Sequence, residues 1–216
     1  IFVGDNRLKY LEPLTAGLGN DDVQFILDEK AFIIGGRFAK KTIGFTYFDP
    51  RREIMEITAY DDHINLTAGP YYCAVRAGDE IWYGGNNMIA VYDEKDDFWR
   101  TLDETRSFSG QIITDMEADS DFVWIASSSG LSRLNQSSKR SNPIGFEKMF
   151  NHLFIYDIEL VDNQLWIASD YDLTVIDLSN ERVLNFKQIG SLGNMAGIED
   201  MLSGFKVLEQ FKDQII

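Results

Sequence analysis

Short apolar runs separated by polar turns fill this chain, and the clearest example is Asp121–Leu134, DFVWIASSSGLSRL. This stretch holds an apolar segment with a tryptophan, a turn of small residues, and a second segment in which apolar and polar residues alternate. Nearly the same phrase returns at Asn163–Ile176 (NQLWIASDYDLTVI), and a looser copy lies at Asp79–Tyr92 (DEIWYGGNNMIAVY). Alternation bounded by turn residues is typical of β-hairpins, so the pattern predicts an all-β chain built from a repeated hairpin.

The repeat has a regular period. The position before the small-residue step is occupied, in order, by Ile33, Trp82, Trp124 and Trp166, at spacings of 49, 42 and 42 residues. A period of about 40–45 residues with four short strands is typical of one blade of a β-propeller. The large side chain is expected to fill the wedge between neighbouring blades. The small residues two positions later are expected to let the backbones approach each other: Gly35, Gly84, Ala126 and Ala168.

Four blades follow directly from this period. We predict them at residues 22–60, 70–105, 110–149 and 152–190. The outer strand of the third blade is indistinct around Pro143–Met149, and Gly190–Gly204 is expected to be a long connection.

The two ends of the chain predict a fifth, composite blade. Residues 204–216 are expected to join residues 1–14, with Phe2 at the tryptophan position and Gly4 at the small position. The fold prediction is therefore a single domain, residues 1–216. It is a β-propeller of five four-stranded antiparallel blades, closed by pairing of the N- and C-terminal segments. The alternative is a slice of a seven- or eight-bladed ring.

Composition and charge limit the classes of binding partner that this chain is expected to have. The chain has 35 acidic and 20 basic residues, a formal charge of −15, and no basic cluster of the kind that binds phosphate. We therefore expect a protein, or a neutral or cationic ligand, and neither nucleic acid nor an anionic membrane surface. No apolar run approaches 18 residues, so this segment is not expected to insert into a membrane. The start at Ile1 without an initiator Met indicates a processed or excised piece.

The third repeat, ITDMEADSDFVWIASSSGLSRLN, resembles the two-component regulator propeller repeat. That family's pattern runs through an Ile-rich strand, an acidic turn, Trp-Ile-Gly-Thr and Gly-Leu. Here Ala126-Ser127 replaces Gly-Thr, and the fourth repeat has Asp172-Leu173 in place of Gly-Leu. The resemblance implies a propeller that serves as an extracytoplasmic (periplasmic or extracellular) sensory region or as a binding platform.

Acidic residues recur at one position of the innermost strand. Asp115 and Glu117 in the third blade match Asp157 and Glu159 in the fourth, and Glu209 follows in the next repeat. Residues two apart on a strand share a face, so these carboxylates are expected to gather near the ring axis and bind ligand at the channel mouth. The sharper hypothesis is Ca²⁺ on the first four or a basic ligand group. The plainer one is carboxylates that face water or pair with cations and backbone amides. Crowding without a cation predicts that at least one pKa is raised.

Aromatic residues and possible catalytic residues are the remaining candidates for a functional site. Tyr60, Tyr71 and Tyr72 are expected to contact a ligand such as a sugar, whereas the three repeated tryptophans are assigned to the core. No nucleophile, zinc or nucleotide motif is present, and no catalytic residue or resident cofactor is assigned. We predict a non-catalytic binding or scaffold propeller, with a sensory domain as one form of it. The alternative is a glycan-processing enzyme that uses Asp115, Glu117 and Asp157.

Overall fold

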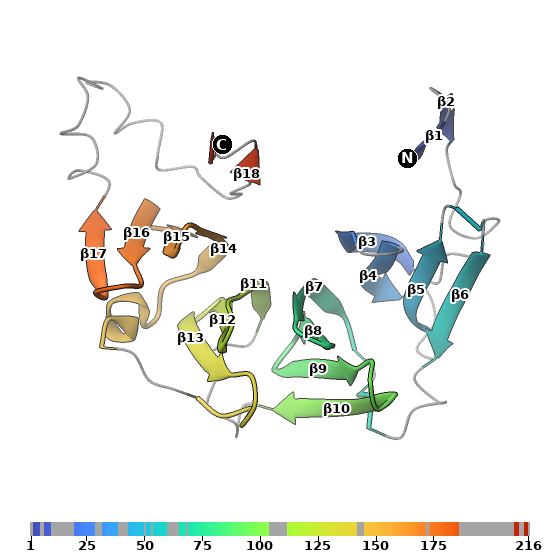
Figure 1. The fold of residues 1–216 in the computed structure, drawn as a ribbon, viewed down its shortest axis with the longest axis horizontal. Coiled ribbons are helices and arrows are strands. Elements are labelled where there is room, and N and C mark those ends of the chain that lie inside the picture. Colours follow the sequence, from blue (N-terminus) through green and yellow to red (C-terminus); the bar gives the residue numbers. More distant parts are fainter. Residues whose placement is uncertain are drawn as a thin grey trace.

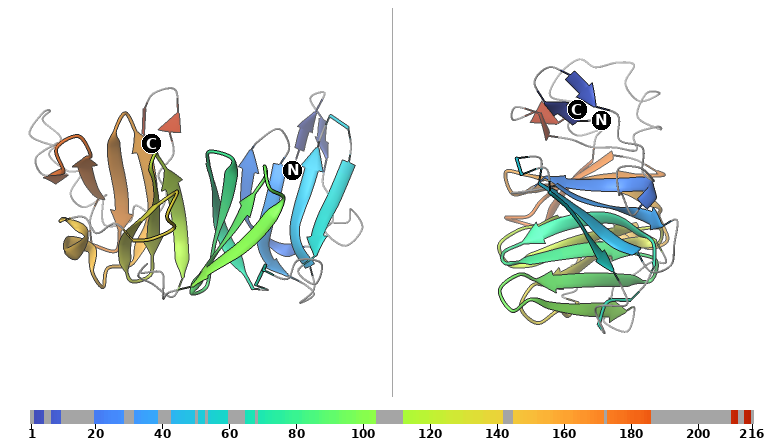
Figure 2. Two further views of the ribbon diagram at one scale, coloured as in Figure 1. Left: turned by 60° about the horizontal axis from the view of Figure 1, so that its bottom comes forward. Right: turned by 90° about the vertical axis from the view of Figure 1, so that its right-hand side faces the viewer.

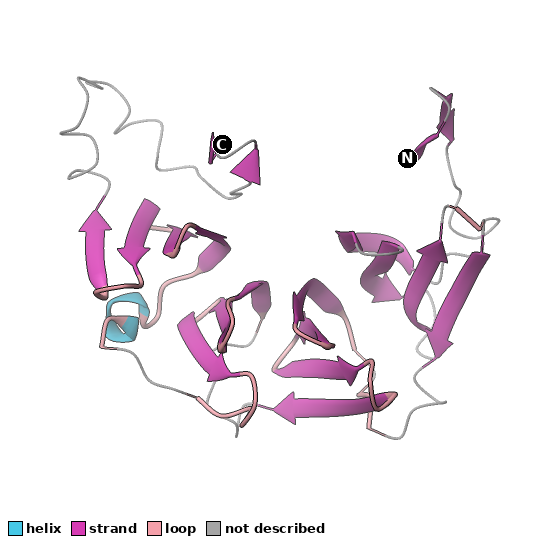
Figure 3. Ribbon diagram, viewed as in Figure 1, coloured by secondary structure: helices cyan, strands magenta, loops and turns pink. Residues whose placement is uncertain are grey.

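The computed structural model describes fourteen segments of the chain: residues 2–4, 7–9, 20–28, 32–38, 43–49, 51–52, 54–59, 65–67, 69–103, 112–141, 145–171, 173–185, 210–211 and 214–215. Their strands pair antiparallel throughout, and one short 3-10 helix, η3 (Glu147–Phe150), is the only helix in these segments. Within the same segments, no helix has both the length and the apolar character needed to cross a membrane. The all-β prediction is confirmed (Figure 3).

Four sheets follow one another in chain order, and we refer to them as blades one to four. Blade one contains β3 (Asn20–Asp28), β4 (Phe32–Phe38), β5 (Ile43–Asp49) and β6 (Ile54–Ala59). Blade two contains β7 (Tyr71–Ala77), β8 (Glu80–Gly85), β9 (Met88–Asp93) and β10 (Phe98–Asp103). Blade three contains β11 (Ile113–Ala118), β12 (Phe122–Ser127) and β13 (Gly130–Asn135). Blade four contains β14 (Ile155–Val161), β15 (Gln164–Ser169), β16 (Leu173–Asp177) and β17 (Arg182–Asn185).

The blades form an arc with the first strand of each blade on the inside (Figure 1). Within each blade the strands pair in sequence order, so every connection is a hairpin. Figure 2 views the arc from the side, where the turns lie at two opposite ends of the strands. Among the described residues, blade three has three strands rather than the predicted four, and Leu134 makes an isolated bridge to Ser141 before η3.

The predicted pairing of the two chain ends is not found. Phe2 lies in β1 (Phe2–Gly4), which pairs with β2 (Arg7–Lys9), whereas Ile215 lies in β19 (Gln214–Ile215), which pairs with β18 (Gln210–Phe211). These are two separate sheets, and N and C lie on either side of the opening in Figure 1. Each end therefore pairs with its own sequence neighbour, which costs less loop-closure entropy than pairing with the distant end.

All four innermost strands share one irregularity. The register of β7 shifts between Tyr71 and Cys73, and β11 and β14 shift at the equivalent place, before Asp115 and Asp157; β3 shifts similarly before Phe25. Such a bulge bends the strand and re-aims the side chains beyond it. In blades two to four the next residue lies opposite the small residue that the sequence singled out: Gly84, Ala126 and Ala168.

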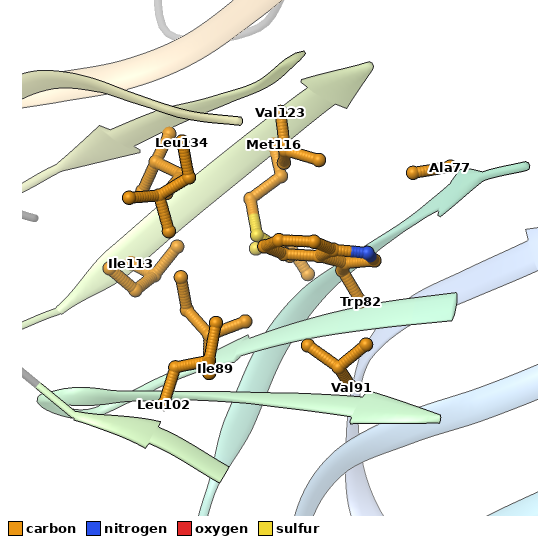
Figure 4. Packing of buried hydrophobic residues seen from close by; sticks show 11 residues of the cluster. Ala77, Trp82, Ile89, Val91, Leu102, Ile113, Met116, Val123 and Leu134 are labelled. Carbon is orange, nitrogen blue, oxygen red and sulfur yellow. The ribbon is translucent and has the colours of Figure 1, made fainter. Parts of the chain in front are cut away.

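The tryptophan at the repeated position packs against the blade that follows it. Trp82 is 0% exposed and belongs to a cluster that includes Ile113, Met116 and Val123 of blade three. Figure 4 shows its ring with Met116 and Val91 beside it. Gly84 allows this approach, because a Cβ there would lie 2.5 Å from Ile113 Cγ2 and 2.6 Å from the Cys73 sulfur.

The same arrangement recurs one blade later. Trp124 is buried in a cluster with Ile158 and Leu165 of blade four. Trp166 of blade four is only half-buried. The prediction of a tryptophan that fills the wedge between blades is thus confirmed for Trp82 and Trp124.

Candidate functional site

The structure brings the repeated carboxylates of β11 and β14 together on the inside of the arc. Asp115 Oδ2 accepts a hydrogen bond of 3.0 Å from the backbone N–H of Ile158, which belongs to the next blade. The hydroxyl of Thr114, the residue in the bulge, donates a hydrogen bond of 2.6 Å to the carbonyl oxygen of Ile155. Adjacent residues of β11 therefore hold the backbone of β14, and Asp115 serves the contact between two blades.

The pKa of Asp115 is raised well above its ordinary value, first by burial and then by its interaction with Asp157, whereas the hydrogen bond from the Ile158 N–H lowers it. The net effect disfavours the ionised form of Asp115 relative to a free aspartate.

Glu117 lies two residues further along the same strand. Burial raises its pKa to about 8, and the charges of Glu159 and Asp157 add to the effect. The thiol of Cys73 in blade two also has a raised pKa, first because of burial and then because of the charges of Asp115 and Asp157. The expectation that crowded carboxylates have a raised pKa is confirmed for Asp115 and Glu117.

The structure leaves the ligand-binding and metal roles of these residues as predictions. Within the described ranges, no group of three or more His, Cys, Asp or Glu side chains is arranged to hold a metal ion. Glu209, the fifth predicted member, lies outside those ranges. The hydrogen bond from the Ile158 N–H to Asp115 gives this carboxylate a role in the contact between blades three and four.

Of the predicted aromatic contacts, the structure describes Tyr71 and Tyr72. Tyr71 is fully buried, packs against Phe45 with ring centroids 5.1 Å apart, and donates a hydrogen bond of 2.7 Å to the carbonyl oxygen of Thr67. The prediction that Tyr71 contacts a ligand is therefore wrong, because its position before the bulge turns it into the core between blades one and two. Tyr72, the residue in the bulge, is half-buried, and Tyr60 lies outside the described residues.

A different group of apolar side chains lies on the face of the molecule at which the innermost strands begin. We term this face the start face. Its members lie in or beside blades three and four. Tyr171, at the tip of the β15–β16 hairpin, is 81% exposed, and Met149 of η3 and Ile112 before β11 are 56% and 37% exposed. Phe154 and Tyr156 add a half-buried ring pair with centroids 4.9 Å apart.

Hydrogen bonds connect the Tyr171 hairpin and β11 to the backbone beside the ring pair. The N–H of Asp170, next to Tyr171, donates to the carbonyl oxygen of Phe154 at 2.9 Å. Thr114 reaches the carbonyl of Ile155, which lies between the two rings of the pair. We define the start-face patch as the set Ile112, Met149, Phe154, Tyr156 and Tyr171.

The opposite end of the strands carries acidic turns. The exposed acids of this acidic face are Asp79, Glu94, Asp96, Asp97, Asp121, Asp162 and Glu181. The turns there share one backbone hydrogen bond, seen from Glu94 to Asp79 (3.0 Å), from Gln136 to Asp121 (2.8 Å) and from Leu178 to Asn163 (2.9 Å). The two faces thus differ in chemistry, one apolar and aromatic, the other acidic.

The start-face patch was missed from the sequence, although a signal for it exists. Tyr171 occupies the hairpin position that holds Asn87 in blade two and Ser129 in blade three. Small polar residues suit a tight turn, and a large aromatic ring there gains nothing from the turn itself. The departure from the repeat therefore marked Tyr171, whereas the search for residues shared by the repeats passed over it.

Several solved structures share the arrangement of these sheets. An extracellular domain assigned to a one-component system of B. thetaiotaomicron matches with a TM-score of 0.59 at 16% identity, over 76% of this chain and 22% of that chain. The extracellular domain assigned to a hybrid two-component system of the same organism gives 0.60 at 16% identity, over 76% and 22%. The WD40 repeats of RRP9 give 0.58 at 10% identity, over 76% and 50%.

These matches concern the fold alone, because the identities are low. The chain spans about a fifth of the length of the two sensor structures, 22% in each case. Neither a protein-family model nor a curated protein matches the sequence. The resemblance found in the third repeat is confirmed at the level of the fold. The chain is an all-β protein with a β-propeller-like arrangement of antiparallel sheets, similar to the extracellular domains of one-component and two-component sensors.

Proposed function

We propose that this chain is a non-catalytic sensory or binding module that works outside the cytoplasm and binds its ligand through the start-face patch. The observation that carries this proposal is the exposure of Tyr171, at 81%, at the end of the strands where Met149 and Ile112 are also exposed. An exposed group of large apolar residues marks a binding surface more often than a solvated one. The likeness in fold to extracellular sensor domains supports the location.

The chemistry of the patch favours a neutral ligand with flat faces, such as the sugar rings of a glycan. Aromatic rings offer large rigid apolar faces, and a few polar groups at the edge fix the orientation of a ligand. The neighbouring hairpin tips supply such groups in Asn86, Ser128 and Asp170. A formal charge of −15 disfavours phosphorylated ligands.

The geometry of the carboxylates gives no support to glycan hydrolysis. A glycosidase separates its two carboxyl groups by about 5 Å or more, so that the sugar and water fit between them. Asp115 instead accepts the hydrogen bond from the Ile158 backbone N–H, so its carboxylate is used in the contact between two blades.

The test is a calorimetric titration of the chain with a panel of neutral oligosaccharides. Tyr171→Ala is expected to weaken binding by about tenfold, the value of one stacked ring. The matched control is Phe98→Ala, an aromatic residue that is 44% exposed beside the acidic turn Glu94–Asp97 and should leave the affinity unchanged. Equal losses in the two variants, or no binding of any oligosaccharide, would overturn the proposal.

We also propose that a further blade packs against blade four. The indole N–H of Trp82 donates to Glu80 at 3.0 Å, and that of Trp124 donates to Asp119 at 3.0 Å. The Nε1 of Trp166 is buried but has no hydrogen-bond partner among the described residues, and its ring is only half-buried. A following blade would cover the Trp166 ring in the way that blade three covers Trp82 and blade four covers Trp124.

Acrylamide quenching of variants that keep one repeated tryptophan would test this proposal. Trp166 should be more accessible than Trp82 in the present chain, and should become protected in a longer polypeptide that supplies the next repeat. Equal protection of Trp166 and Trp82 from the quencher in the present chain would contradict the proposal, because it would mean that the Trp166 ring is already covered.

A further inference from the structure

Two apolar positions recur on the innermost strand of every blade, on the side of the strand that faces the preceding blade. The first lies immediately before the register shift of the strand, and the second lies three residues later. In blades one to four the first position holds Val23, Tyr71, Ile113 and Ile155, and the second holds Ile26, Ala74, Met116 and Ile158.

In blades two, three and four, the preceding blade covers these positions. Five of the six side chains are 2% exposed or less: Tyr71, Ile113, Met116, Ile155 and Ile158. Tyr71 packs against Phe45 of blade one, and Ala74 is partly buried against the same cluster. The two side chains of blade three lie in the cluster of Trp82, and the two of blade four lie in the cluster of Trp124.

Blade one leaves the same two positions exposed. Val23 is 42% exposed and Ile26 is 55% exposed. Phe25, on the other side of β3, faces blade two, with its ring centroid 6.2 Å from that of Tyr83. Exposed apolar side chains at a position that the fold covers in three other blades indicate a contact surface. By continuity with the other contacts, this surface fits the tryptophan-bearing face of another blade.

Blade four carries such a face. Trp166 occupies the repeated tryptophan position, and its ring is only half-buried. Its buried Nε1 has no hydrogen-bond partner among the described residues. Blades one and four lie at the two ends of the arc, on either side of the opening in Figure 1. One molecule therefore carries both halves of the repeated contact, at opposite ends of the arc.

We propose that two copies of this chain associate head to tail, with β3 of one copy packed against the Trp166 face of the other. The inference rests on the further blade proposed above and identifies that blade, for the present chain, as blade one of a second copy. The contact joins two different surfaces, so it closes only when the last copy meets the first. Two arcs of four blades would form a ring of eight, within the usual range of β-propellers.

The charge of the chain predicts how this association depends on salt. Each copy has a formal charge of −15, so two copies repel each other, whereas the side chains in the proposed contact are apolar. Added salt screens the repulsion and should therefore strengthen the association. Association that weakens as salt is added would point to ion pairs and contradict the proposed contact.

Sedimentation velocity over a series of protein concentrations tests the association. The unsubstituted chain should change from monomer to dimer as its concentration rises. Ile26→Asp should remain monomeric, because it places a charge in the apolar contact. The matched control is Phe98→Asp, which adds the same charge at a side chain that is 44% exposed on β10 and should dimerise like the unsubstituted chain. A monomeric unsubstituted chain at every concentration, or equal dimerisation of the two variants, would overturn the proposal.

A mixing experiment distinguishes a head-to-tail contact from a symmetrical one. Trp166→Ala should also remain monomeric, because it removes the other half of the contact. Mixing Trp166→Ala with Ile26→Asp should restore dimers, since the pair retains one intact contact. Dimerisation of Trp166→Ala alone to the extent of the unsubstituted chain would show that β3 does not bind blade four, and a mixture that stays monomeric would also refute the head-to-tail contact.

Acrylamide quenching separates failure of this inference from failure of the further blade. In dilute, monomeric protein the Trp166 ring should be accessible, and it should become protected as the dimer forms. An accessible Trp166 in a chain that never dimerises would refute the second copy and leave the further blade in place. A protected Trp166 in the dilute monomer would refute both. Oligosaccharide binding through Tyr171 does not depend on either result.

Discussion

The two contacts between blades two and three and between blades three and four are built on the same plan but differ at the axis. Both bury a tryptophan against the following blade, Trp82 in the first contact and Trp124 in the second. At the axis the first contact has Cys73, a small buried thiol, where the second has Asp115. The comparison shows that the repeats share the apolar packing around the tryptophan. The residue type at the axial position differs between them, a thiol in one and a carboxylic acid in the other.

The outer parts of the two contacts differ as well. Lys139, in the turn after β13, is buried beside Glu80 with Nζ 2.5 Å from Oε2, and lies over the Trp82 ring at 4.9 Å. A cation from blade three therefore supports the acid that accepts the Trp82 indole N–H. In the second contact Asp119 accepts the Trp124 indole N–H and also two backbone N–H groups in its own turn, those of Asp121 and Phe122. Charge pairing supports the first contact, and backbone hydrogen bonds support the second.

The largest expected effect comes from removing the tryptophans. Trp82→Ala and Trp124→Ala should each lower the free energy of unfolding by about 3–5 kcal/mol, because each empties a fully buried site. Trp166→Ala should cost clearly less, since its ring is only half-buried. Urea denaturation followed by circular dichroism measures all three. A loss for Trp166→Ala as large as for Trp82→Ala would show that blade four is already covered.

The pH dependence of the second contact is expected to be the next largest effect. Glu117 has an ordinary pKa of 4.5 and a folded pKa of about 8. Between these values the folded state binds more protons than the unfolded chain, so the free energy of unfolding falls as the pH rises and levels off above about 8. Glu117→Gln should therefore stabilise the chain at pH 9 by roughly 2–4 kcal/mol and have little effect at pH 4. Urea denaturation at the two pH values measures this difference, and equal shifts at both would contradict it.

A smaller effect is expected from closing the space at Gly84. Gly84→Ala places a methyl group against Ile113 and Cys73 and should cost about 1–3 kcal/mol by overpacking. Gly145→Ala is the matched control, because a Cβ there meets nothing within 4 Å. Parallel urea titrations compare the two variants. Equal stability of both would mean that the two blades move apart freely.

The smallest effect concerns the reactivity of Cys73. Its thiol is buried, and burial together with nearby Asp115 and Asp157 raises its pKa, so little thiolate is present at neutral pH. Alkylation by iodoacetamide should be slow in the folded chain and fast in urea. Rapid labelling of the folded chain at pH 7 would place the thiol in contact with solvent.

The sequence predicted most of the strands, because their period is carried by large and small residues that packing requires. Trp82, Trp124 and Gly84 illustrate this, since each lies where two blades meet. The gathering of Asp115 and Asp157 was also predictable from spacing alone, because equivalent residues of adjacent blades are neighbours at the axis.

Three features of the structure could not be predicted from the sequence repeat. The burial of Tyr71 depends on a bulge that changes which face of the strand it occupies. The start-face patch depends on Tyr171, where the sequence departs from its own repeat. The separate sheets of β1 and β19 reflect pairing of each strand with its neighbour in the sequence, β2 and β18, rather than with the distant end. In each case local backbone geometry or a single exception outweighed the periodic signal.

The position of the repeated tryptophan has a consequence for how stability is distributed along the chain. Each of Trp82 and Trp124 gains its cover from the unit that comes after it. Stability in such an array is the sum of unit terms and nearest-neighbour terms. If the chain were truncated from the C-terminal side, the last remaining blade would lose the stabilisation that its following blade provides. Unfolding should then start in that blade and proceed toward the N-terminus.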